Sequence, residues 1–220
     1  MKVERTGRNL KKIDFLPEGI RNWYINLISP ATDLFIRLGV NPNFFTTVGF
    51  LISIVATYVV ATGHLRWGGV LILLGGTFDI LDGKVARATD RVTKFGALYD
   101  STLDRYSEVM IFFGLAYYFS SVEIEYIGIE WSIWIVVAIS IAIGGSVMTS
   151  YVRARAEGLG LECKVGIMQR AERVVYLGFG ALFHEITLIL AILVIAVLAN
   201  VTAIQRIYHI WKTEKSSKPL

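Results

Sequence analysis

The sequence has 220 residues, of which 54% are hydrophobic, and its mean hydropathy of +0.55 lies well above that of a typical soluble domain. The formal net charge of +4 does not indicate nucleic acid as a partner, because the basic residues lie between apolar runs rather than along one polar face. The single cysteine excludes an intrachain disulfide. The composition therefore predicts an all-α integral membrane protein whose partners include membrane lipids.

The N-terminal part of the chain is expected to lie at the membrane surface. Residues 1–15 form a basic tail, which suits a negatively charged cytoplasmic leaflet. Over residues 18–40 apolar side chains recur at helical spacing, with Pro30 interrupting the pattern. These residues predict an amphipathic interfacial helix that is kinked or broken at Pro30. The Asn41-Pro42-Asn43 stretch that follows suits a turn and a helix cap.

Six apolar runs follow, and we interpret them as six transmembrane helices, since a span requires about 20 residues. They cover residues 44–62, 67–81, 95–120, 131–151, 165–183 and 186–207. We expect a single domain over residues 1–220, composed of a tail and interfacial helix (1–43), a six-helix transmembrane bundle (44–211) and a C-terminal tail (212–220).

The distribution of positive charge predicts the orientation in the membrane. Six spans place both termini on the same side, and of the 22 Lys and Arg residues all but Arg66 belong to that side or to helix ends that face it. Basic residues favour the cytoplasmic face of a membrane. We therefore expect a multi-pass protein with both termini and the charged helix ends in the cytoplasm.

Four aspartates are the most unusual feature of the second and third spans. A charge within a transmembrane helix costs at least ~2.5–3.5 kcal/mol on insertion scales. Residues three or four positions apart share a helix face, so Asp79 with Asp82, and Asp100 with Asp104, form two stripes that can meet across the connecting turn. Oxygen ligands without a nearby His or Cys favour Mg²⁺ or Mn²⁺, and two ions would roughly balance the four carboxylates. Paired ions of this kind commonly bind phosphoryl groups.

Structural ion pairs and cation transport are the alternative roles for these aspartates. Ordinary ion pairs with neighbouring cations such as Lys84 and Arg105 could explain two carboxylates but do not account for all four. A divalent-cation transporter would need a polar path that continues across the bilayer, whereas the other halves of these spans are apolar. A metal-dependent phosphotransfer site explains the spacing better than either.

The aspartates belong to a longer pattern that resembles a known family. The sequence Asp79-x-x-Asp82-Gly83-x-x-Ala86-Arg87 is followed after eight residues by Gly96, and then by Asp100 and Asp104 at intervals of four. This pattern resembles the complete signature of the CDP-alcohol phosphotransferase family. The resemblance implies a homodimeric membrane enzyme that transfers a phosphatidyl or ether-lipid group from CDP-diacylglycerol or CDP-archaeol to a hydroxyl acceptor and releases CMP.

The same resemblance implies roles for individual residues. Asp79, Asp82 and Asp100 would be metal ligands, and Asp104 would be the general base and a ligand of the second ion. The residues expected to bind the CDP-lipid are Gly83, Ala86, Arg87, Thr93 and Gly96, together with the segment Pro42, Asn43, Phe44, Phe45 and Thr46 that would close over the nucleotide.

Four arginines beyond residue 150 bear on the acceptor. Arg153, Arg155, Arg173 and Arg206 are predicted at the cytoplasmic ends of three helices, and guanidinium groups suit a phosphate monoester. The segments 150–157 and 169–173 are similar to those of phosphatidylinositol phosphate synthases and their archaeal counterparts, although Gln169 and Ala171 differ from the usual Glu and Pro. This similarity implies inositol phosphate as the acceptor, with glycerol 3-phosphate or another phosphorylated polyol as the alternative.

Overall fold

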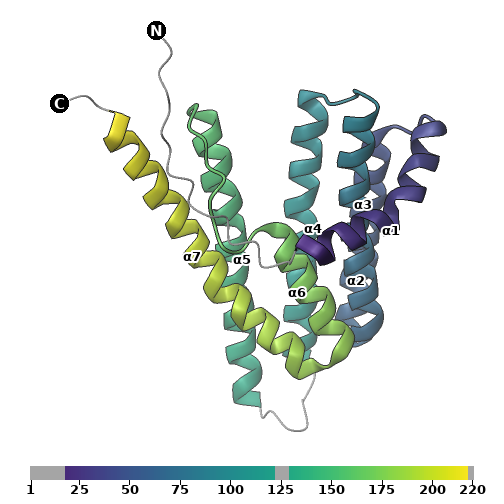
Figure 1. Cartoon of the computed structure of the whole chain (residues 1–220). Helices are drawn as coiled ribbons and strands as arrows, with labels where there is room; N and C mark the ends of the chain where they lie inside the picture. Colours follow the sequence, from purple (N-terminus) through teal and green to yellow (C-terminus); the bar gives the residue numbers. More distant parts are fainter. Residues whose placement is uncertain (1–17, 122–128, 218–220) are drawn as a thin grey trace.

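The computed structural model describes residues 18–121 and 129–217, which form an all-α fold of seven helices (Figure 1). The helices are α1 (Glu18–Arg37), α2 (Pro42–Ala61), α3 (Leu65–Ala88), α4 (Lys94–Ser121), α5 (Ile129–Gly158), α6 (Arg170–Phe183) and α7 (Glu185–Ser217). The all-α prediction is confirmed. The predicted basic tail over 1–15, residues 122–128 and the last three residues lie outside the described residues.

Helices α2 to α7 pack around a common core. In the described part of the chain, α2 contacts α3 and α4, α3 contacts α6, α6 contacts α7, α7 contacts α5, and α5 contacts α4, so the contacts close a ring. The apolar core inside the ring includes Phe112, Phe119, Ile139 and Ile192. In such a ring each helix packs against two neighbours. A helix that is apolar on most of its surface can bury one face against each of them.

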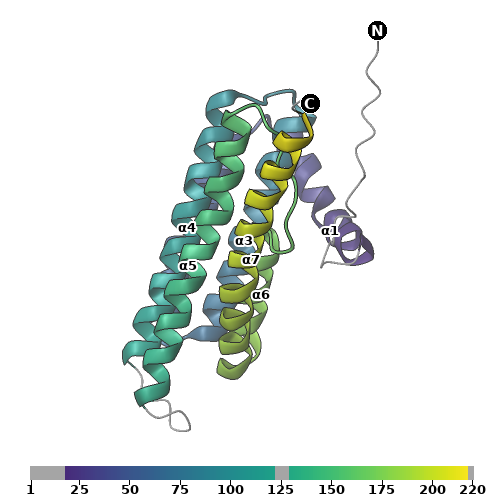
Figure 2. The same cartoon turned by 90° about the vertical axis from the view of Figure 1, so that its left-hand side faces the viewer.

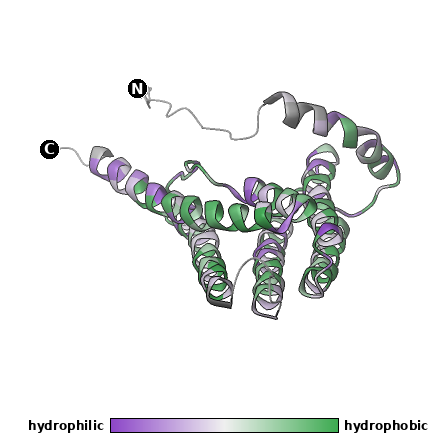
Figure 3. Ribbon diagram, turned by 90° about the horizontal axis from the view of Figure 1, so that it is seen from below, coloured by the Kyte–Doolittle hydropathy of each residue, from purple (hydrophilic) through white to green (hydrophobic). Residues whose placement is uncertain are grey.

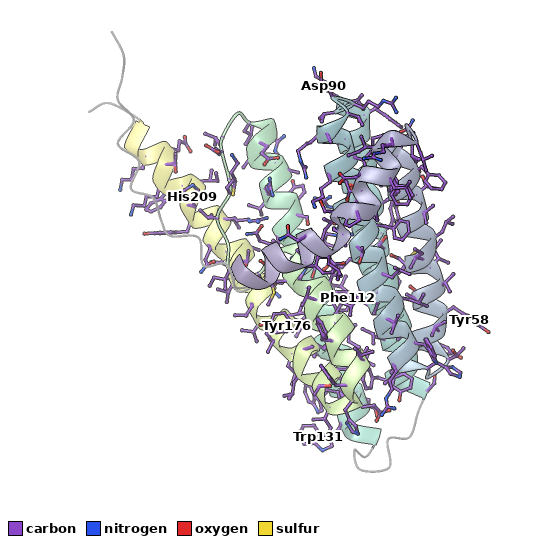
Figure 4. All side chains as sticks on the ribbon, turned by 45° about the vertical axis from the view of Figure 1, so that its right-hand side comes forward. Tyr58, Asp90, Phe112, Trp131, Tyr176 and His209 are labelled. Carbon is purple, nitrogen blue, oxygen red and sulfur yellow. The ribbon has the colours of Figure 1, made fainter. Side chains whose placement is uncertain are left out.

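The bundle has two distinct ends. Asp90 lies at one end and Trp131 at the other, with Phe112 between them (Figure 4). Figure 2 shows that the turn between α3 and α4 and the C-terminal end of α7 lie at the same end as each other, which we call the Asp90 end. At this end α5 and α7 diverge from α2, α3 and α4 (Figure 1).

Within residues 18–121 and 129–217, three helical segments are long and apolar enough to cross a membrane: Pro42–Ala61, Trp131–Gly158 and Glu185–Lys215. Figure 3 shows apolar residues along most of the helices and polar ones near the C-terminal end of α7. These segments contain the predicted fourth and sixth spans and all but the last residue of the predicted first span. The six-span arrangement as a whole stays a prediction.

The predicted fifth span starts too early. We expected it to cover residues 165–183, but α6 begins at Arg170 and has 14 residues. The helix starts there because Glu172 Oε2 accepts a hydrogen bond from the Gln169 backbone N–H at 2.8 Å, satisfying a free donor at the helix N-terminus. Gly166 has a φ of +132°, which is not a helical value, so the helix cannot begin as early as residue 165.

Helix α1 packs against the aspartate-bearing part of α3. Ile28 joins Phe45, Leu81 and Val85 in a second small core, and the Tyr24 hydroxyl hydrogen-bonds to Thr77. Of the predicted kink or break at Pro30, the structure shows the kink: the helix continues through Pro30, and Figure 1 shows that its course bends. A kink without a break is the usual effect of an internal proline.

Candidate active site

The turn between α3 and α4 brings the two aspartate stripes together. Carboxylate oxygens of Asp79, Asp82 and Asp100 lie within 4.8 Å of one another. Asp90, in the turn, adopts a φ of +55°, a left-handed conformation that Asp tolerates better than most residues. The reversal of the chain at this turn places α3 and α4 so that the two stripes face each other, as the helical spacing predicts.

The surroundings of this trio fit a hard divalent cation. The Thr46 hydroxyl donates to Asp82 Oδ2 at 2.8 Å and so orients that carboxylate. Asp100 Oδ1 is buried and has no hydrogen-bond partner among the described residues. A small cavity of about 20 Å³ lies against all four aspartates. Buried carboxylate oxygens without protein donors are the ligands that Mg²⁺ and Mn²⁺ prefer.

Asp104 lies beside the trio of Asp79, Asp82 and Asp100, and its ion-pair partner is Arg170. Its Oδ1 atom lies 2.7 Å from Nη2 of Arg170, while Nη1 of the same arginine donates to Asp79 Oδ2 at 2.7 Å. Arg170 is the first residue of α6, so this helix contributes to the site together with α3 and α4. Arg170 was not among the predicted site residues, although it stands in the same segment as Arg173.

A second cavity, of about 240 Å³, opens next to the aspartates. Eight residues predicted to bind the CDP-lipid line it: Pro42, Asn43, Thr46, Gly83, Ala86, Arg87, Thr93 and Gly96. Asp82 and Asp100 line both cavities, so the two are adjacent. The remaining two predicted residues do not line this second cavity: Phe44 is exposed, whereas Phe45 is fully buried, lines the small cavity at the aspartates, and has its ring centre 4.9 Å from that of Phe35.

Local hydrogen bonds explain the shape of this cavity. Asn41 caps α2 by accepting from the Asn43 backbone N–H at 3.0 Å, and Pro42 occupies the first turn, where its missing N–H costs nothing. Thr93 Oγ1 accepts from the Gly96 N–H at 2.9 Å at the start of α4. The Asn41-Pro42-Asn43 stretch is therefore a helix cap, and its Pro42 and Asn43 also form part of the cavity wall.

Arg91 is a further wall residue that was not predicted from the sequence. Its Nη1 atom donates to the Gly39 carbonyl at 2.9 Å, which ties the α3–α4 turn to the segment before α2. With Arg87 it gives the cavity two guanidinium groups, which suits a pyrophosphate.

We expect Gly83→Ala to weaken binding of a ligand in this cavity without loss of stability. A Cβ atom at Gly83 would lie 3.1 Å from Arg87 Nη1 and would displace that guanidinium. Within a helix the change adds about 1 kcal/mol of helix propensity, so thermal stability should be unchanged or higher. The matched control is Gly144→Ala on α5, where no atom lies within 4 Å of the added Cβ. A rise of at least about threefold in KM for a CDP-lipid in Gly83→Ala alone is expected; equal KM values in both variants would contradict it.

The four arginines proposed for the acceptor have different surroundings. Arg155 is exposed, and Arg153, partly exposed, pairs with Glu157 at 2.9 Å. Arg173 is fully buried and donates to both oxygens of Glu108 on α4, at 2.5 and 2.9 Å. Arg206 donates to the carbonyls of Val165 and Thr149 at 2.8 and 2.5 Å.

Arg153 and Arg173 lie close enough to Arg206 for their positive charges to act on it. The segment 159–169 is held by hydrogen bonds to its backbone. Arg206 donates to the Val165 carbonyl, and Arg173 Nη1 donates to the Met168 carbonyl at 3.3 Å. The Thr202 hydroxyl accepts from the Met168 N–H at 2.9 Å. Two arginines, Arg173 and Arg206, thus hold this segment by hydrogen bonds to its backbone carbonyls.

Cys163, in the same segment, is expected to react slowly with thiol reagents. The side chain is fully buried, and this burial raises the pKa of its thiol, although Arg206 and Arg153 act in the opposite direction. Because only the thiolate reacts, maleimide labelling of the folded protein should be at least about tenfold slower than that of the protein unfolded in detergent. Equally fast labelling would show that segment 159–169 opens in solution.

The comparison with protein families agrees with this geometry. A family model described as CDP-alcohol phosphatidyltransferase matches residues 39–212, a range that contains the aspartate cluster and both cavities. The chain belongs to the CDP-alcohol phosphatidyltransferase family. It is therefore a membrane-associated enzyme whose signature aspartates are those brought together here.

Relatives within the CDP-alcohol phosphatidyltransferase family are similar over most of their length. The archaetidylinositol phosphate synthase of Methanothermobacter thermautotrophicus is 37% identical over 192 residues, covering 86% of this chain and 90% of that protein. The phosphatidylinositol phosphate synthase of Mycobacteroides abscessus is 35% identical over 197 residues, covering 86% of each chain.

Solved structures of the phosphatidylinositol phosphate synthase of Mycobacterium tuberculosis share the fold. The one with CDP-DAG bound is 27% identical, has a TM-score of 0.76 and covers 89% of this chain and 98% of that one. Another, in complex with manganese and citrate, is 28% identical, has a TM-score of 0.73 and covers 87% of this chain and 92% of that one. The manganese complex and the aspartate trio together support a divalent metal in this enzyme.

Proposed function

We propose that this enzyme transfers the lipid-bearing phosphoryl group of a CDP-linked lipid to a hydroxyl of inositol phosphate and releases CMP, in phospholipid biosynthesis. The observation that carries the proposal is the adjacency of the two cavities: Asp82 and Asp100 line both the small cavity at the aspartate cluster and the larger one lined by Gly83 and Arg87. A nucleotide pyrophosphate in the larger cavity would have its phosphorus atoms next to the carboxylates.

The donor would bind in the cavity of 240 Å³. Arg87 and Arg91 would contact the pyrophosphate, while Gly83 and Gly96 allow it to approach the backbone. Pro42, Asn43 and Thr46 would contact the nucleotide from α2, and the exposed Phe44 would close over it. Relatives named archaetidylinositol phosphate synthase and phosphatidylinositol phosphate synthase are similarly close in sequence, so either CDP-archaeol or CDP-diacylglycerol suits as donor.

The chemistry follows from the positions of the carboxylates. The acceptor oxygen attacks the phosphorus that bears the lipid alcohol, the bond from that phosphorus to the CMP oxygen breaks, and Asp104 takes the hydroxyl proton. Asp79, Asp82 and Asp100 would hold Mg²⁺ or Mn²⁺, with Asp104 contributing to a second ion. Two such ions would offset the charge of the transferred phosphoryl group and of the departing CMP.

The acceptor phosphate would bind at Arg153, Arg155, Arg173 and Arg206, on α5, α6 and α7. Arg153 and Arg155 are accessible to solvent, whereas Arg173 and Arg206 are buried, Arg173 in its ion pair with Glu108. Such an arrangement favours a phosphorylated polyol over an uncharged alcohol.

The protein would lie in the membrane as a single domain. We propose that α2 to α7 form six spans, that α1 lies at the membrane surface, and that the Asp90 end with both termini faces the cytoplasm, where CDP-lipids and phosphorylated polyols are supplied. Family resemblance supports a homodimer. The mass of the purified protein in detergent, corrected for bound detergent, tests that oligomeric state.

The acceptor is tested by measuring CMP release from purified enzyme with a CDP-lipid, Mg²⁺ or Mn²⁺, and each acceptor in turn. Inositol phosphate should support turnover, and inositol or serine should not. Turnover with glycerol 3-phosphate alone would make the enzyme a phosphatidylglycerol phosphate synthase and would reject our first choice. Cation uptake by sealed vesicles without any CMP release would reject the whole reaction class.

A further inference from the structure

Arg170 holds two of the carboxylates that the proposed reaction requires. Its two terminal nitrogens contact different aspartates: Nη1 lies 2.7 Å from Asp79 Oδ2 on α3, and Nη2 lies 2.7 Å from Asp104 Oδ1 on α4. The guanidinium thus bridges the two helices. Asp79 is at the same time a member of the trio with Asp82 and Asp100, so one aspartate is shared between the arginine and the candidate metal site.

This bridge differs from the neighbouring ion pair of Arg173. The Arg173 and Glu108 side chains are 1% and 5% exposed and share two hydrogen bonds, so they fix α6 to α4. The Arg170 side chain is 22% exposed, and its buried Nε has no hydrogen-bond partner among the described residues. Release of Arg170 from its aspartates would therefore leave α6 attached through Arg173.

A guanidinium and a divalent cation repel each other and use the same carboxylate oxygens. An ion bound by the trio can use Asp82 and Asp100, because the ion pairs of Arg170 are with Asp79 and Asp104. An ion bound between Asp79 and Asp104 must instead take the place of the guanidinium. The two ions of the proposed mechanism are therefore not equivalent.

We propose that Arg170 is a positioning residue that makes divalent-cation binding sequential, since the second ion binds only when this arginine releases Asp79 and Asp104. The inference rests on the proposed function for its second ion. Release has a further consequence. The released guanidinium becomes free to contact a phosphate of the bound substrate, to which it can donate two parallel hydrogen bonds.

The test is a Mn²⁺ titration of the purified protein in lipid nanodiscs, without substrate, with free Mn²⁺ measured by electron paramagnetic resonance. In the unmodified protein we expect one ion to bind at least about tenfold more tightly than the second. In Arg170→Gln the ratio of the two dissociation constants should fall by at least about tenfold, because the competing charge is gone. Arg170→Lys should give an intermediate ratio, since one ammonium group cannot reproduce the two-pronged contact.

The matched control is Arg105→Gln. Arg105 also acts electrostatically on Asp100, but its guanidinium bonds to the Ser101 carbonyl. Loss of this charge should change both binding steps together and leave their ratio within about twofold. A purely structural role of Arg170 would likewise leave the ratio unchanged.

Three results would overturn the inference: two equivalent ions in the unmodified protein, an unchanged ratio in Arg170→Gln, or complete loss of the second ion in that variant. If Arg170→Gln does not fold, an unchanged ratio in Arg170→Lys decides against the inference. The titration contains no substrate, so its result is separate from the CMP assay. An enzyme that used no phosphorylated acceptor would contradict the proposed function and leave the titration intact.

Discussion

Asp104→Asn is expected to reduce CMP release by about 10²–10⁴-fold while the protein still folds, because an amide cannot accept the proton of the acceptor hydroxyl. Asp104 is mostly buried beside Asp79 and Arg170, and its side chain is 16% exposed. The substitution keeps the shape of the side chain, so donor binding in the adjacent cavity should persist. The measurement is kcat for CMP release at saturating donor and acceptor, together with the thermal unfolding midpoint in detergent.

The control for this variant is Asp90→Asn. Asp90 is exposed at the same end of the bundle, and Asn tolerates its left-handed backbone conformation equally well. This change should leave turnover within about twofold of the unmodified enzyme. Turnover near normal in Asp104→Asn would show that another group accepts the proton.

Glu108→Gln is expected to lower the free energy of unfolding by about 3–5 kcal/mol, because it leaves the charge of Arg173 buried without its partner. The Arg173 side chain is completely buried and bonds to both oxygens of Glu108. The loss should appear as a lower thermal unfolding midpoint in detergent. It should be larger than that of Glu157→Gln, which breaks the exposed pair with Arg153.

A double variant separates the structural role of this pair from a role in substrate binding. Replacing Glu108 by Leu and Arg173 by Met removes both buried charges at similar volume, so most of the lost stability should return. If Arg173 also contributes to the acceptor site, the double variant should be stable but have a raised KM for inositol phosphate. A double variant less stable than Glu108→Gln would contradict the assignment of the lost stability to an unpaired charge.

The sequence predicted the helices better than their ends. Period and length located α2 to α7 because apolar faces repeat along a continuous segment. The start of α6 was misplaced because residues 165–169 are apolar enough to resemble a span, while the helix begins only where Glu172 accepts the Gln169 N–H. Pro30 bends α1 without ending it, since packing of Ile28 and Tyr24 against neighbouring helices supports the helix around it.

In the site, residues close together in the sequence were predicted well. Asp79 and Asp82 share one helix face, and Asp100 is brought to them by a short turn, so local geometry nearly suffices. Only part of the predicted segment from Pro42 to Thr46 faces the larger cavity. Pro42, Asn43 and Thr46 line it, whereas Phe45 packs into the core. Successive residues of a helix point in different directions, so a contiguous motif seldom faces one cavity as a whole.

The sequence and the tertiary structure each determined a different property of the four aspartates. The sequence by itself determined that four carboxylates gather at one end of an apolar bundle and that their spacing is that of the CDP-alcohol phosphatidyltransferases, because both features are local in the chain. Only the tertiary structure decided which cations face them. Arg170 reaches Asp79 across 91 residues, and Arg173 pairs with Glu108 across 65. Such partners depend on which helices pack together in the folded bundle. The spacing of residues along a single helix does not predict them.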